Sequence, residues 1–163
     1  MFTRIDRAIL RRLQEDGRVA YSELAEALGV PRATLHRRVK ALEREGVIRR
    51  YTAVLDPTKL GYKFLAFVLI RARRTVPKEG ESSQVTLARE LLERSSAEAD
   101  FPWIEEAHIV TGPYDILLKV WVREWDGLTT FLTAQLPAYE DIEHTETILV
   151  LNRVGERWGF RIE

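Results

Sequence analysis

The spacing of apolar residues in this 163-residue chain changes at Gly46, and that change limits the folds open to it. Before Gly46, apolar residues recur every three or four positions, as in Ile5, Ile9 and Leu13. After it, apolar runs such as Phe64 to Ile70 have the length and composition of strands. A short helical segment followed by mixed strands and helices is therefore predicted, which places the chain in the α+β class.

The first 50 residues are predicted to form three short helices. Thr3 and Asp6 have the spacing of a capping box at the start of the first helix. Ser22 is a candidate N-cap for the second helix, and Gly29 is expected to end it. Pro31 suits the first turn of the third helix, because a nitrogen there has no partner within the helix. Two helices joined by a short turn that contains glycine form the helix-turn-helix pattern.

The rest of the chain is predicted to follow the order β-α-β-β-α-β, which is typical of a ferredoxin-like domain. After an expected strand at 47–55, the predicted strands and helices cover residues 64–73, 85–95, 104–111, 116–122, 125–136 and 142–154. Trp158, Phe160 and Ile162 alternate with polar residues and indicate a last short strand or a docked tail. The domains expected are 1–50 for helix-turn-helix, 51–63 for a linker strand and hinge, and 64–163 for the βαββαβ part.

The formal net charge is zero, but the two parts of the chain carry opposite charges. Residues 1–50 hold 12 Lys/Arg and 7 Asp/Glu, a net of +5, and residues 51–163 hold 13 and 18, a net of −5. Residues 1–31 balance at 5 and 5, so the positive excess lies in residues 32–50. A basic helix on an otherwise balanced chain is typical of a DNA-contacting segment. The alternative is a small helical bundle with a solvated arginine-rich face.

Composition and motifs argue against several other classes of protein. The chain has no cysteine, which excludes disulfides and thiolate metal sites and fits a reducing, cytoplasmic compartment. Its three histidines have no close spacing, and neither a glycine-rich phosphate loop nor a nucleophile elbow is present. No apolar run approaches the ~18 residues of a membrane span, and no signal peptide is recognisable. We therefore expect no enzyme activity, metal, cofactor or membrane association.

The third helix supplies the candidate DNA contacts. Leu35, Val39 and Leu42 are expected to face the core, so the basic residues between them lie on the outer side. The candidates are Arg32, Thr34, His36, Arg37, Arg38 and Lys40. Arg32 and Arg37 are the best candidates for bidentate contact with guanine, and the later basic residues suit phosphate contacts.

Short motifs in register with these elements resemble a known family. They are Ile5 to Leu10, Asp16 to Arg18, Glu23 to Ala25, Arg38 to Ile48, Tyr51 to Pro57, the turn with Val110, Gly112, Tyr114 and Asp115, and the pair Thr145 and Thr147. Together they resemble the Lrp/AsnC family of feast/famine transcription regulators along nearly the whole chain. The resemblance implies an N-terminal winged helix-turn-helix and a C-terminal βαββαβ domain of the RAM type that binds an effector and forms oligomers.

The resemblance also implies partners and effector-binding residues. Family members form dimers, often assembled into tetramers or octamers, and bind double-stranded DNA and a small effector, usually an amino acid, between dimers. The matching effector-binding positions are Gly112, Tyr114, Asp115, Thr145 and Thr147. From the residues alone, a turn-capping role is favoured for Asp115. Ordinary β-propensity explains the two threonines, and a close backbone approach or a positive φ explains Gly112.

Two departures from the family pattern and two alternative functions remain open. Residues 75–102 are longer and more acidic than the usual connection, and the segment from Leu136 to His144 lacks a glycine that often follows Leu-Pro.

The main hypothesis is a DNA-binding transcriptional regulator controlled by a small effector. The alternatives are an enzyme similar to the sirohaem decarboxylases, with His108 or His144 as porphyrin ligand, and an architectural DNA-binding protein without effector.

Overall fold

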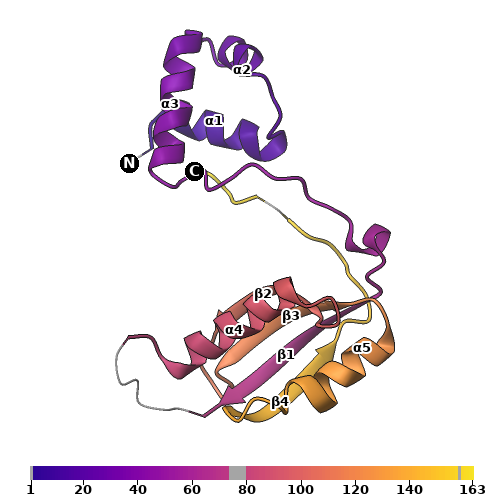
Figure 1. Ribbon diagram of the computed structural model, residues 1–163. Helices are drawn as coiled ribbons and strands as arrows, with labels where there is room; N and C mark the ends of the chain where they lie inside the picture. The colour runs from indigo at the N-terminus through magenta and orange to yellow at the C-terminus, as the bar shows by residue number, and fades with distance from the viewer. Residues whose placement is uncertain (1, 74–79, 158) are drawn as a thin grey trace. The chain divides into compact units, whose positions relative to one another are not determined.

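The computed structural model describes residues 2–73, 80–157 and 159–163, which fall into two compact units. One unit comprises Met1–Val54 and Val154–Glu163, and the other comprises Leu55–Arg153. The first unit therefore contains segments from both ends of the chain (Figure 1). The sequence placed residues 154–163 with the second domain, whereas their contacts group them with the first unit.

The first unit contains three helices, as predicted. They are α1 (Arg4–Glu15), α2 (Tyr21–Ala27) and α3 (Arg32–Arg44). The capping box at the start of α1 is confirmed, since the Asp6 N–H donates to Thr3 Oγ1 at 3.2 Å and the Thr3 N–H donates to the Asp6 carboxylate at 2.8 Å. Ile9, Leu24 and Leu35 are almost completely buried and form one core with the remaining apolar positions of the three helices.

Two predicted helix starts were wrong by one or two positions. Helix α2 begins earlier than expected because the Leu24 N–H donates to the Ala20 carbonyl at 2.9 Å, so Ser22 lies inside the helix and is not its cap. Pro31 is the N-cap of α3 and not a first-turn residue. Gly29 does adopt the left-handed conformation expected of a helix-ending glycine, with a φ of 64°.

The strand predicted at residues 47–55 was wrong. The N–H groups of Val47 and Ile48 donate back to the Leu42 carbonyl at 2.9 and 3.1 Å. The segment makes no strand pairing with any described residue, and it leads into the 3₁₀ turn η1 (Pro57–Leu60). A strand needs a neighbouring backbone for its N–H and C=O groups. No described segment offers one here, and Val54 and Leu55 are more than half exposed.

The second unit is a four-stranded antiparallel sheet with helices on one face (Figure 1). Its elements are β1 (Phe64–Ala72), α4 (Ser83–Ala97), β2 (Trp103–Ile109), β3 (Ile116–Val122), α5 (Trp125–Thr130), a π-helical turn (Phe131–Gln135) and β4 (Ile142–Leu149). The strand order is β2-β3-β1-β4, so the predicted ferredoxin-like domain is confirmed. Strand β4 ends at Leu149 and not, as predicted, at residue 154.

The two faces of the sheet differ in burial. Val68, Ile70 and Leu118 point towards α4 and α5 and are fully buried. The opposite face carries half-buried Leu69 and exposed Ile148, and no described element of the second unit covers these side chains. An exposed apolar face of this kind is typical of a surface that another molecule covers.

The C-terminal residues form a docked tail and not a strand. The Arg11 guanidinium donates to the Ile162 carbonyl at 2.6 and 3.1 Å. The Gln14 carboxamide donates to the Phe160 carbonyl at 3.1 Å and accepts from its N–H at 2.6 Å. Trp158, the first residue of the predicted alternation, lies outside the described residues. The tail therefore lies along α1 through backbone groups of Phe160 and Ile162.

Candidate functional site

Helix α3 has one buried face and one exposed basic face. Leu35, Val39 and Leu42 are at most 3% exposed, as the sequence predicted. Arg32 and Arg37 are exposed, and neither guanidinium forms an ion pair with any described residue. Both side chains are therefore available to a ligand such as a nucleic acid.

Arg38 is drawn towards the core of the first unit. Its guanidinium lies 3.7 Å from the carboxylate of Asp6, which is 6% exposed. Burial alone would raise the pKa of Asp6, but the hydrogen bonds from Thr3 and the charge of Arg38 together hold that pKa below its ordinary value. Arg38 thus joins α3 to the start of α1, and it is less free than Arg37 to reach DNA.

Lys40 and His36 also have partners within the first unit. Lys40 Nζ lies 2.8 Å from the Glu43 carboxylate, whose other oxygen accepts from the Tyr51 hydroxyl at 3.2 Å. The hydrogen bond from Lys40 lowers the pKa of Glu43. The His36 ring packs edge-on against Tyr21, with centroids 6.1 Å apart. Among the predicted DNA contacts, Thr34 is half-buried, which limits it to a contact near the helix surface.

The turn between β2 and β3 holds the predicted effector residues Gly112 and Asp115. Gly112 has a φ of 121°, which only glycine adopts readily, so the positive φ expected of it is confirmed. Asp115 is 6% exposed, and its carboxylate accepts from the Ala72 N–H at 3.0 Å. Its own N–H donates to the Ile70 carbonyl at 2.9 Å. Asp115 therefore fastens the turn to the end of β1.

The predicted effector residues do not all lie on one face of the sheet. Thr145 and Thr147 pair with Ile70 and Val68, so both threonines lie on the face that the helices cover. Tyr114 instead donates from its hydroxyl to Glu146, which alternates with the threonines and lies on the open face. The Tyr114 ring also stacks on His144, with centroids 6.2 Å apart. The structure thus places Tyr114 apart from the two threonines.

A pocket of about 380 Å³ lies beside Gly112 and Asp115. Arg71 and Glu143 also line it, and their charged groups lie 3.6 Å apart. Sequence reasoning did not single out these two residues. Only the pairing of β1 with β4 shows that these two residues are close, because it brings Arg71 next to His144 and its neighbour Glu143.

Neither a metal-binding cluster nor a membrane-spanning helix is present among the described residues. No group of three or more His, Cys, Asp or Glu side chains among them could hold a metal ion. Within the same residues, no helix combines the length and hydropathy needed to cross a bilayer.

The first unit is a helix-turn-helix with an exposed basic helix, and the second is a ferredoxin-like domain with a pocket at its hairpin turn. Together they define a class of DNA-binding proteins that carry a ligand-binding domain. Comparison with protein families agrees with both parts. Residues 2–49 match the winged helix-turn-helix DNA-binding model, and residues 65–158 match the Lrp/AsnC ligand binding domain. The chain belongs to the Lrp/AsnC family of transcriptional regulators.

Similar proteins cover nearly the whole chain. An uncharacterised HTH-type transcriptional regulator of Pyrococcus horikoshii is 36% identical over 96% of this chain and 89% of its own length. The leucine-responsive regulatory protein of Salmonella typhimurium is 36% identical over 94% of this chain and 87% of its own length. The structure of E. coli AsnC is 29% identical, with a TM-score of 0.77, and covers 96% of this chain and 97% of its own. These relatives favour a regulator over the sirohaem-decarboxylase alternative.

Proposed function

We propose that α3 lies in the major groove of double-stranded DNA and that Arg32 and Arg37 contact base edges there. The two exposed guanidiniums, which pair with no carboxylate among the described residues, carry this proposal. Thr34 and His36 lie along the same helix and add contacts to thymine methyl groups or phosphates, while Arg38 and Lys40 contact phosphates after leaving their carboxylate partners. Such a protein works in the cytoplasm, with the DNA it regulates.

The effector is an amino acid bound in the pocket beside the turn. Arg71 and Glu143 present opposite charges, which suit the carboxylate and the ammonium of a zwitterion. Gly112 and Asp115 shape the pocket, and Tyr114, Thr145 and Thr147 are further contacts when a neighbouring dimer completes the site. A relative with 36% identity is named for its response to leucine, which supports this class of effector.

The protein is a homodimer that assembles further into tetramers or octamers. The open face of the sheet supports the dimer, because half-buried Leu69 and Leu117 and exposed Ile148 form a contiguous apolar patch there. A second copy of the same face would cover this patch symmetrically. The dimer would present two copies of α3 to the two half-sites of an operator.

Binding to DNA from the chain's own upstream region tests the DNA contacts. Arg37→Ala should weaken specific binding by ~1–3 kcal/mol and leave binding to scrambled DNA much less affected. Arg89→Ala removes the same charge from the exposed side of α4 and serves as the control. Equal losses on both DNAs would reassign Arg37 to a phosphate. Affinity should also fall steeply with salt, and a flat salt dependence would contradict DNA binding altogether.

Thermal unfolding with each of the common amino acids tests the effector. A ligand that binds only the folded protein raises its stability, so the effector should raise the Tm. Arg71→Gln should abolish the rise, because the carboxylate of the ligand loses its cationic partner. If no amino acid raises the Tm, the alternative of an architectural DNA-binding protein without effector is favoured.

A further inference from the structure

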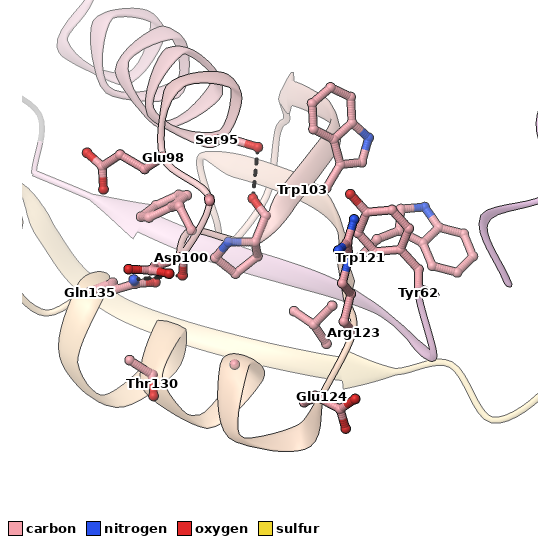
Figure 2. A pocket seen from close by; sticks show the side chains of 15 residues that line it. Tyr62, Ser95, Glu98, Asp100, Trp103, Trp121, Arg123, Glu124, Thr130 and Gln135 are labelled. Atoms are coloured by element: carbon pink, nitrogen blue, oxygen red, sulfur yellow. Dashed lines mark hydrogen bonds between the residues drawn. The ribbon is translucent and has the colours of Figure 1, made fainter. Parts of the chain in front are cut away.

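The acidic loop between α4 and β2 borders a second pocket that the proposed function does not use. It has a volume of about 630 Å³ and lies between this loop, the end of β3 and the start of α5 (Figure 2). That volume is within the range of ~300–1,000 Å³ found for small-molecule sites. No residue of the turn at Gly112 and Asp115 lines it.

The loop is held in place by interactions that leave the pocket open. Ser95 is 7% exposed, and its Oγ donates to the Pro102 carbonyl at 2.8 Å and accepts from the Ile104 N–H at 2.7 Å. Phe101 packs edge-on against Phe131, with centroids 5.1 Å apart. These contacts fix the loop without any ligand, so little ordering entropy would be lost on binding.

One side of the pocket is aromatic. Trp103 and Trp121 are direct neighbours on β2 and β3, and the Tyr62 ring lies edge-on to Trp121 at 6.4 Å. Figure 2 shows the three rings together, with Arg123 beside them. The Arg123 guanidinium lies 5.1 Å from the Tyr62 ring centre, whereas Trp103 is 43% exposed. Trp103 therefore offers a ring surface to a ligand.

The other side of the pocket is acidic and rich in acceptors. Three carboxylates and one guanidinium line the pocket, from Glu98, Asp100, Glu124 and Arg123. Glu98 pairs with Arg94 at 2.9 Å and Glu124 with Lys63 at 2.5 Å. Asp100 forms no side-chain ion pair or hydrogen bond with any described residue, since its one bond, from Gln135, goes to its backbone carbonyl.

Gln135 supplies a second hydrogen-bond acceptor that has no donor among the described residues. Its Nε2 donates to the Asp100 carbonyl at 3.2 Å, but its Oε1 is buried and accepts no hydrogen bond within the described part of the chain. A buried polar atom without a partner costs ~1–3 kcal/mol. A donor brought into the pocket beside Asp100 would remove this cost after a small rotation of the carboxamide.

We propose that this pocket binds an organic cation, a primary amine attached to an apolar or aromatic body. The ammonium pairs with the Asp100 carboxylate and donates to Gln135, and the body packs on Trp103. An ammonium also gains from nearby aromatic rings. A carboxylate ligand would instead be repelled by Asp100, the one lining carboxylate that has no cationic partner among the described residues, since Glu98 pairs with Arg94 and Glu124 with Lys63. The site differs from the amino-acid pocket beside the turn in both place and charge.

Three probes that share a phenylethyl group test the class of ligand on the full-length protein. Phenethylammonium carries only the amine, 3-phenylpropionate carries only the acid, and phenylalanine carries both. Isothermal titration should show millimolar binding of phenethylammonium and at least tenfold weaker binding of 3-phenylpropionate. Equal affinity for both would overturn the proposal. Phenylalanine binding that is tighter than phenethylammonium binding and is weakened by Asp100→Asn would also overturn it, because Arg123 would then pair with the ligand carboxylate and the pocket would be an amino-acid site.

Variants test whether the ligand binds in this pocket. Asp100→Asn should weaken phenethylammonium binding about tenfold, which corresponds to about 1.4 kcal/mol, while Asp126→Asn, on the exposed side of α5, should leave it unchanged. Gly127→Leu should block binding, because a Cβ at Gly127 meets no atom within 4 Å and the added side chain would occupy the pocket. Unchanged binding in both Asp100→Asn and Gly127→Leu would show that the amine binds elsewhere.

Discussion

Replacing Asp115 by alanine should destabilise the ligand-binding unit even in the absence of any effector. The Asp115 carboxylate accepts a hydrogen bond from the Ala72 N–H at 3.0 Å, and both residues are at most 6% exposed. In Asp115→Ala, the Ala72 N–H would stay buried without this acceptor. The bond also joins the hairpin turn to the end of β1, so its loss would loosen the wall of the effector pocket.

The expected magnitude follows from the two partners. A hydrogen bond to a charged group contributes ~1.5–3 kcal/mol, and an unpaired buried N–H costs ~1–3 kcal/mol. We therefore expect Asp115→Ala to lower the free energy of unfolding by about 2 kcal/mol. Asp115→Asn keeps a carbonyl oxygen that can accept from Ala72 but loses the charge, so its loss should be about half as large.

Urea unfolding followed by tryptophan fluorescence measures this effect. Trp103, Trp121 and Trp125, three of the four tryptophans, lie in the ligand-binding unit. With a denaturant slope of ~1–3 kcal/mol per molar urea, the midpoint of Asp115→Ala should fall by about 1 M. Asp126→Ala, which removes an exposed carboxylate, is the control. A wild-type midpoint in Asp115→Ala would refute the structural role and leave effector binding as the reason for this residue.

Four further predictions concern the capping box of α1, the turn at Gly112 and the open face of the sheet. Thr3→Ala removes the N-cap hydroxyl of α1 and should lower the free energy of unfolding by ~1 kcal/mol. The pKa of Asp6 is lowered in the folded state, so its contribution to the free energy of unfolding is complete above the ordinary value of 3.8 and is lost as pH falls below that value. The stability of Asp6→Asn should therefore depend less steeply on pH in acid unfolding. Gly112→Ala places a Cβ at a φ of 121° and should lower stability by ~1–3 kcal/mol in thermal unfolding. Ile148→Glu should dissociate the proposed dimer in sedimentation experiments, whereas Thr133→Glu, outside the sheet, should not.

The order of helices and strands could be predicted because burial in this chain follows simple periods. The spacing of Leu35, Val39 and Leu42 predicted α3 and its buried face, and both proved right. The alternation at residues 47–55 predicted a strand that is not formed. Alternation reports which side chains could share a face, but a strand also needs a second backbone, and its presence depends on the whole fold.

The candidate sites were harder to predict because they depend on contacts between distant segments. Arg38 was grouped with Arg37 as a DNA contact, yet it lies beside the buried Asp6 in the first turn of α1. Thr145 was grouped with Tyr114, but the register of β4 against β1 places the two on different faces. A slip of one residue in that register would reverse the faces, and the sequence alone does not set the register.

The tail on α1 has a consequence for the synthesis of the protein. Residues 154–163 belong to the DNA-binding unit, although all of Leu55–Arg153 separates them from the helices that they contact. On the ribosome, the ligand-binding unit is therefore fully translated before Phe160 and Ile162 emerge, and only then can the DNA-binding unit gain the bonds that Arg11 and Gln14 make to these two residues. The nascent chain can thus form a ligand-binding domain before its DNA-binding domain is complete.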